Sequence, residues 1–147
     1  MNIMVSRYAA PAFAALLIVL TAFIIAAMGM SRSTSVSKSP EFATVATGDF
    51  MMSLNEPGSV ILDIRTPEEY SDGHIAGAQN VDFYAESFTE LISRLDRNVP
   101  YKIYCNSGNR SAMAVELMKE LGFTDVTELS GGIQAWARGG GTTCTNC

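Results

Sequence analysis

Short hydrophobic runs alternate with helical patterns over the last two thirds of the chain. The β-branched run at residues 60–64 (VILDI) opens after the turn signal EPGS, and the run at residues 101–104 (YKIY) follows a proline. Hydrophobic runs bounded by turn residues are typical of buried strands. Weaker strand candidates lie at residues 126–129, 78–81 and 43–45.

Two segments between these runs carry hydrophobic residues on one helical face. Residues 88–97 and 111–121 both place them three, four and seven positions apart, and Gly122 follows where a left-handed residue commonly ends a helix. Strands that alternate with such helices predict an α/β fold, in which a small parallel sheet is flanked by helices on both faces. Ligand sites in these folds lie beyond the carboxyl ends of the strands.

The longest hydrophobic stretch lies near the amino terminus. Arg7 and Arg32 enclose 24 uncharged residues, and 19 of the 22 residues at 9–30 are hydrophobic. Because this length suffices to cross a bilayer as a helix, residues 1–30 are predicted to be a transmembrane anchor that contacts the membrane through residues 9–30. A cleaved signal peptide is the alternative. We expect the rest of the chain on the exported side, periplasmic or extracellular, either tethered or secreted.

Composition divides the remainder into three parts. Residues 31–40 (SRSTSVSKSP) have the composition of a solvated linker, and a single domain is predicted at residues 41–139. Residues 140–147 (GGTTCTNC) are expected to form a flexible tail that ends in a C-x-x-C pair. The pair could be a redox site, a thiol acceptor for sulfur, a partial metal site or an oxidised tail, because the spacing alone is weak evidence.

Charge also divides at the linker. Residues 1–40 carry a net charge of +3 and residues 41–147 carry −8, which together give −5. An acidic domain without a basic stripe argues against nucleic-acid binding. Three cysteines are too few for a disulfide scaffold, and with one histidine they form no four-ligand zinc pattern at these spacings. We therefore predict neither a metal site nor a cofactor.

The strongest candidate chemistry follows the strand at residues 101–104. Cys105 begins a short polar loop that leads directly into the next helix. Backbone N–H groups of such a loop and of the helix end can bind negative charge and favour the thiolate, which is the nucleophilic form of cysteine. Arg110 adds a permanent charge and forked donors for an anionic substrate. His74, the only histidine, is predicted to be structural rather than a general base.

Four segments carry a family resemblance. They are LDIRTPEEY at residues 62–70, GHIAGA at 73–78, CNSGNRS at 105–111 and LSGGIQAW at 129–136. In this order they resemble the successive signatures of a single-domain rhodanese. The resemblance implies a small α/β domain in which a cysteine takes up a sulfane sulfur as a persulfide and passes it to a nucleophilic acceptor.

The resemblance also implies roles for individual residues. Cys105 is the sulfur carrier, and the substrate-binding loop around it comprises Asn106, Ser107, Gly108, Asn109, Arg110 and Ser111. A supporting polar shell comprises Asp63, Arg65 and Glu69, and the packing of the last helix involves Gly131, Gly132 and Trp136. Ala76 departs from the family pattern, which commonly has proline there, and this bears on loop rigidity more than on chemistry.

Loop length favours sulfur over phosphate as the transferred group. Related phosphatases place one more residue between cysteine and arginine, whereas here the four residues 106–109 make a smaller ring that would crowd a phosphoryl group. The expected function is a sulfurtransferase that uses a small sulfur-donor anion such as thiosulfate, with a thiol or cyanide as acceptor. A non-catalytic binding module at the membrane and a thiol-redox protein based on Cys144 and Cys147 are the alternatives.

Overall fold

The computed structural model describes residues 39–147. The predicted anchor or signal peptide at residues 1–30, and most of the predicted linker at residues 31–40, lie outside the described residues. Within the part that is described, no helix is long and apolar enough to cross a membrane.

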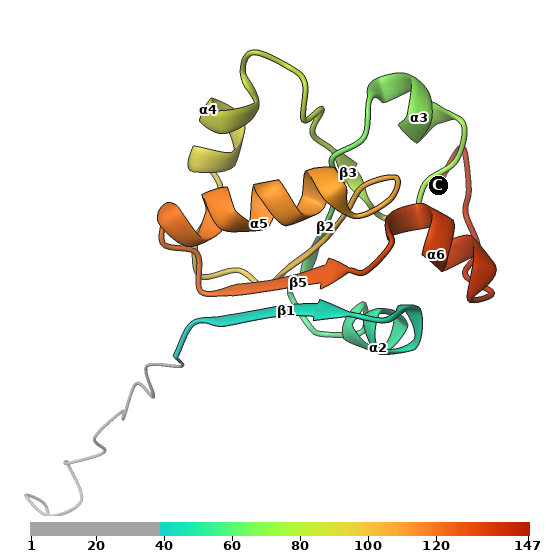
Figure 1. Cartoon of the computed structure of the whole chain (residues 1–147), viewed down its shortest axis with the longest axis horizontal. Coiled ribbons are helices and arrows are strands. Elements are labelled where there is room, and N and C mark those ends of the chain that lie inside the picture. Colours follow the sequence, from blue (N-terminus) through green and yellow to red (C-terminus); the bar gives the residue numbers. More distant parts are fainter. Residues whose placement is uncertain (1–38) are drawn as a thin grey trace, which may run out of the picture. The chain divides into compact units, whose positions relative to one another are not determined.

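The described residues form a five-stranded parallel sheet with the strand order β1-β5-β4-β2-β3 (Figure 1). The strands are β1 (Glu41–Val45), β2 (Val60–Asp63), β3 (Gln79–Asn80), β4 (Tyr101–Tyr104) and β5 (Asp125–Leu129). All five strand candidates therefore form strands, and the predicted small parallel sheet is confirmed. The carboxyl ends of β4 and its neighbours β2 and β5 meet at one edge of the sheet, where a ligand site is expected.

The helices are α2 (Thr47–Ser53), α3 (Pro67–Ser71), α4 (Phe88–Ser93), α5 (Asn109–Glu120) and α6 (Gly132–Arg138). Helix α4 ends four residues before the predicted end, and α5 begins two residues before its predicted start. Gly122 has a φ of 83°, and the N–H groups of Gly122 and Phe123 donate to the carbonyls of Lys119 and Met118. This is the left-handed helix end that the sequence predicts.

Helices α2 and α3 were not predicted from the hydrophobic pattern. Helix α2 buries Phe50 alone, and α3 buries no residue, so neither carries a periodic hydrophobic face. Local polar contacts start α3 instead. Thr66 accepts from the N–H of Glu69, whose carboxylate accepts from the N–H of Thr66, and Pro67 occupies the first turn.

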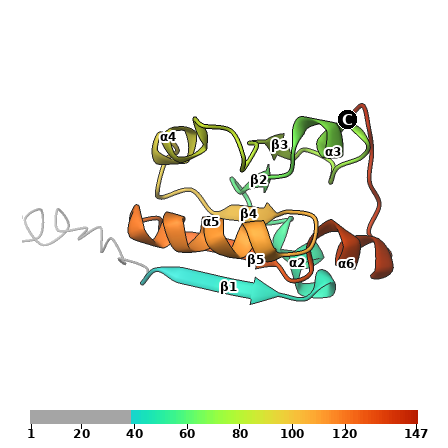
Figure 2. The same cartoon turned by 45° about the horizontal axis from the view of Figure 1, so that its top comes forward.

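Two hydrophobic cores lie on opposite faces of the sheet, because alternate strand residues point to opposite sides. One contains Leu62, Ile103 and Val126 together with the buried faces of α4 and α5. The other contains Tyr104 and Leu129 together with residues of α2 and α6. Figure 2 shows α5 crossing in front of the strands. Helices thus flank the sheet on both faces, as predicted.

One charged side chain is buried in the first half of β4, away from Cys105. Lys102 has a side chain that is 2% exposed, and its Nζ lies 2.7 Å from Glu56 Oε2, 3.1 Å from Thr127 Oγ1 and 4.0 Å from Asp125 Oδ1. These contacts compensate the buried charge, since an ammonium without partners would be costly there.

Candidate active site

Cys105 lies directly after β4, at the start of the loop that leads into α5. Cys105 is 1% exposed, and its Sγ accepts a hydrogen bond of 3.1 Å from the N–H of Gly108. Gly108 is the N-cap of α5 and has a φ of 99°, a conformation that side-chain-bearing residues rarely adopt. The left-handed turn at Gly108 therefore points a backbone donor at the sulfur.

The loop lowers the pKa of the Cys105 thiol. Burial by itself raises this pKa, but hydrogen bonds from the Ser111 hydroxyl and from the N–H groups of Ser111, Gly108 and Ser107 outweigh it. The side chains of Ser107 and Asn109 are exposed, so Ser107 acts on the sulfur through its backbone. These backbone donors surround the sulfur of Cys105 as such a nest would, and they favour its thiolate form; the catalytic role of Cys105 stays a prediction.

Arg110 is held in a two-bonded ion pair with Glu69 of α3. Its Nη1 and Nη2 each lie 2.8 Å from one carboxylate oxygen, and its Cζ lies 5.4 Å from the centre of the Tyr84 ring. The pair holds the pKa of Glu69 at about 2 and raises that of Arg110. Since Glu69 compensates the guanidinium charge, direct binding of an anionic substrate by Arg110 stays a prediction.

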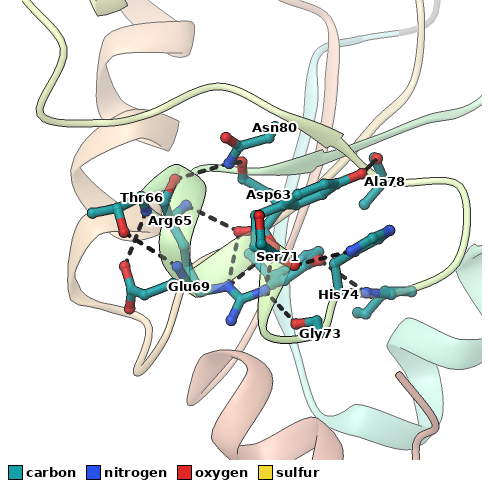
Figure 3. A network of polar contacts seen from close by, with 12 residues as sticks. Asp63, Arg65, Thr66, Glu69, Ser71, Gly73, His74, Ala78 and Asn80 are labelled. Atoms are coloured by element: carbon teal, nitrogen blue, oxygen red, sulfur yellow. Dashed lines mark hydrogen bonds and ion pairs between the residues drawn. The ribbon is translucent and has the colours of Figure 1, made fainter. Parts of the chain in front are cut away.

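Asp63 and Arg65 form a buried pair that braces the turn between β2 and α3 (Figure 3). Arg65 Nη2 lies 2.6 Å from Asp63 Oδ2 and 2.8 Å from the carbonyl oxygen of Gly73. Asn80 Nδ2 donates to the carbonyls of both residues. Of the predicted supporting shell, Glu69 is thus joined to the cysteine loop through Arg110, whereas Asp63 and Arg65 hold the loop that contains His74.

Sequence reasoning missed a carboxylate behind the cysteine. Glu128 of β5 is 4% exposed, and its two oxygens accept from Ser111 Oγ at 2.6 Å and from Thr44 Oγ1 at 2.8 Å. Ser111 Oγ also lies 3.5 Å from Cys105 Sγ. The signal was present in the sequence, because an acidic residue inside a predicted buried strand needs hydrogen-bonding partners.

Helix α6 fixes the other side of the loop. The N–H groups of Ile133 and Gln134 donate to the carbonyls of Cys105 and Asn106 at 2.9 and 3.2 Å. Gly132 permits this approach, since a Cβ there would lie within 2.6 Å of the Asn106 carbonyl and closer still to that of Cys105. The glycine that the resemblance places in helix packing therefore packs against the cysteine loop itself.

His74 lies in the loop after α3, where it is 3% exposed. Its Nδ1 lies 3.0 Å from the carbonyl oxygen of Tyr70, and its ring stacks on the Tyr70 ring with centres 3.8 Å apart. The C-terminal tail pairs with it, since Cys144 and His74 exchange two backbone hydrogen bonds of 2.9 Å. Cys144 is disulfide-bonded to Cys147. These contacts suit a structural histidine and place the predicted tail against the domain.

The family is decided by comparison with known proteins. The sequence model of the rhodanese-like domain matches residues 47–138. The chain belongs to the rhodanese-like domain family.

Curated relatives and solved structures agree with this family. The chain is 37% identical over 83 residues to a thiosulfate sulfurtransferase, GlpE, of Pseudomonas fluorescens. The matched region covers 56% of this chain and 74% of the relative. A rhodanese-related protein from Thermoplasma volcanium has a TM-score of 0.63 at 30% identity and covers 71% of this chain and 99% of its own. A rhodanese-like domain protein from Staphylococcus aureus has a TM-score of 0.57 at 29% identity, covering 64% and 90%.

Proposed function

We propose that the chain is a sulfurtransferase that carries a sulfane sulfur on Cys105. The observation that supports this most is the buried thiol of lowered pKa, which receives a hydrogen bond from the N–H of Gly108 at the end of a parallel strand. The thiolate attacks the outer sulfur of a donor such as thiosulfate. A new S–S bond forms, the donor's own S–S bond breaks, and sulfite leaves with its electron pair.

The second half of the reaction returns Cys105 to its starting state. A thiolate acceptor, or cyanide in an assay, attacks the outer sulfur of the persulfide, and the Cys105 thiolate leaves with the bonding electrons. The loop N–H groups stabilise negative charge on the cysteine sulfur in both halves. The ion pair of Arg110 and Glu69 holds the start of α5 against α3, which keeps these donors in place.

Intact mass measurement tests this proposal. The purified full chain is mixed with thiosulfate and should gain the mass of one sulfur atom, whereas Cys105→Ser should gain none. The double variant Cys144→Ser/Cys147→Ser is the matched control, because it removes the other two cysteines and should still gain one sulfur. No gain on the wild type, or an equal gain on Cys105→Ser, would contradict the proposal.

We further propose that residues 9–30 carry the domain to the exported side of a membrane. The hydrophobic length of this stretch supports either an anchor or a cleaved signal peptide. A reporter that is active only in the cytoplasm, fused after Lys38 of the chain, should be inactive. Activity of that reporter would refute the exported placement, and the molecular mass of the mature chain distinguishes an anchor from a cleaved signal.

A further inference from the structure

Three side chains that could bind a metal ion meet where the C-terminal tail crosses the loop after α3. They are His74, Cys144 and Cys147, and their ligand atoms all lie within 4.8 Å of one another. Histidine nitrogen and cysteine sulfur are the ligands that zinc prefers in proteins. Residues that are 70 positions apart in the sequence therefore form one cluster outside the cysteine loop.

Two segments hold the tail in this position. Trp136 of α6 donates from its Nε1 to the carbonyl oxygen of Thr142 at 2.9 Å, and the backbone of Cys144 pairs with that of His74. Figure 1 shows the C-terminal end of the chain beside α3. The tail that carries the two cysteines is thus held by one side-chain hydrogen bond and one pair of backbone hydrogen bonds.

The orientation of His74 suits a ligand. Its Nδ1 faces the carbonyl oxygen of Tyr70 at 3.0 Å and must therefore carry the proton, which leaves the lone pair of the neutral ring on Nε2. A hydrogen bond from the second ring nitrogen to a carbonyl is the usual support of a metal-bound histidine. Stacking on Tyr70 fixes the ring plane further.

The free nitrogen points at sulfur. His74 Nε2 lies 3.6 Å from Cys147 Sγ. Bond lengths of about 2.0–2.3 Å at a tetrahedral zinc place neighbouring ligand atoms ~3.3–3.8 Å apart, so this pair already has the separation of two zinc ligands. Cys144 supplies the third ligand of the cluster, a second sulfur, from the same short turn.

We propose that the reduced form of this cluster binds one thiophilic metal ion such as Zn²⁺ through His74 Nε2 and the sulfurs of Cys144 and Cys147. Three protein ligands leave the fourth position of the ion for water. A bound ion would fix the tail to the loop after α3. This site is separate from the sulfur-carrying cysteine, and the proposal does not depend on sulfurtransferase activity.

The disulfide is the oxidised, metal-free state of the same site. A dithiol reductant such as dithiothreitol supplies two electrons and two protons, which open the S–S bond to two thiols, and the reductant itself becomes a disulfide. Metal binding then displaces the two thiol protons into solvent. The disulfide and the metal site exclude each other, since both need the same two sulfur atoms.

Cobalt titration tests the proposal because Co²⁺ reports thiolate ligands by absorption. The full chain carrying Cys105→Ser is purified in detergent, reduced, freed of reductant without air and titrated with Co²⁺. We expect one equivalent to produce a thiolate-to-cobalt charge-transfer band together with the visible bands of a tetrahedral site, and Zn²⁺ to abolish both. The oxidised chain should show neither band.

Variants identify the ligands. Cys147 lies at an exposed position, so Cys147→Ser should fold normally. It should weaken the affinity for Co²⁺ by more than the ~10–100-fold that follows loss of a hydrogen bond supporting a ligand. His74→Gln should do the same, while Asn146→Ala, at an exposed position between the two cysteines, should bind as the parent does. The proposal is overturned if the reduced chain shows no charge-transfer band, or if Cys147→Ser binds as tightly as its parent.

Discussion

Replacing Ser111 by alanine tests what sets the reactivity of Cys105. The Ser111 hydroxyl has one proton, and three acceptors lie around it: Glu128 Oε1 at 2.6 Å, the Gly108 carbonyl at 3.0 Å and Cys105 Sγ at 3.5 Å. The sulfur therefore receives only part of this donor. A full hydrogen bond is worth ~1 kcal/mol, so we expect Ser111→Ala to raise the pKa of Cys105, by less than the loss of a full donor would.

Glu128→Gln should change the same pKa in the opposite direction. The amide would compete less strongly for the Ser111 proton than the carboxylate does, and a negative charge near the thiolate would be removed. Ser111 would then donate more fully to Cys105 Sγ, and the pKa of the thiol should fall. Opposite effects of two neighbouring substitutions are difficult to attribute to a general loss of stability.

The assay is the pH dependence of iodoacetamide alkylation at Cys105, measured in the full chain with Cys144 and Cys147 replaced by serine. Ser107→Ala is the matched control, because it removes an exposed hydroxyl from the same loop while keeping the N–H group that acts on the sulfur. Its profile should overlay that of the parent. Identical profiles for Ser111→Ala and the parent would refute the role of the hydroxyl and leave the backbone donors as the cause.

Three further predictions concern the loop, the ion pair and the sheet. Gly132→Ala should slow persulfide formation at least ~10-fold and lower the free energy of unfolding by ~1–3 kcal/mol, because its Cβ would meet the Cys105 and Asn106 carbonyls. Gly48→Ala is the control, since its Cβ would meet nothing within 4 Å, and it should leave the rate unchanged. The pKa of Glu69 is about 2 in the fold against 4.5 for the free group, so its pair with Arg110 stabilises the fold fully above pH 4.5 and loses this effect as the pH falls through about 2. At pH 6 the free energy of unfolding of Glu69→Gln, obtained from thermal unfolding, should be ~1 kcal/mol below that of the wild type, a figure that includes solvent screening. The difference should vanish near pH 2. A difference that stays constant with pH would contradict this. Lys102→Met should lower the free energy of unfolding in urea by ~2–3 kcal/mol, because it leaves Glu56 and Asp125 without this cation. The rate of persulfide formation should not change, and a slower rate would contradict the separation of Lys102 from the site of Cys105.

The sequence predicted the sheet and the reactive loop because both depend on local patterns. The two strongest strand candidates, at residues 60–64 and 101–104, are hydrophobic runs that lie in the buried centre of the sheet, and the motif at residues 105–111 is contiguous. The hydrophobic pattern does not reveal the short helices α2 and α3, because they bury almost no residues; α3 begins instead through the local contacts of Thr66 and Glu69. Pairings between distant residues could not be read from spacing, as the contacts of Glu128 with Thr44 and Ser111 show. The meeting of His74 with the tail depends on the fold in the same way.

The strand order determines when the domain can be completed during synthesis. Strand β1 lies at one edge of the sheet and pairs with β5, with Thr44 opposite Glu128, 84 residues later. While the ribosome is still producing the cysteine loop and α5, β1 has no neighbour, and the Glu128 carboxylate that accepts from Ser111 does not yet exist. Closure of a contact of such long range is slow and comes late. The nascent domain must therefore remain open at its first strand until β5 emerges, so β1 exposes unpaired backbone hydrogen-bonding groups for most of the synthesis of the domain.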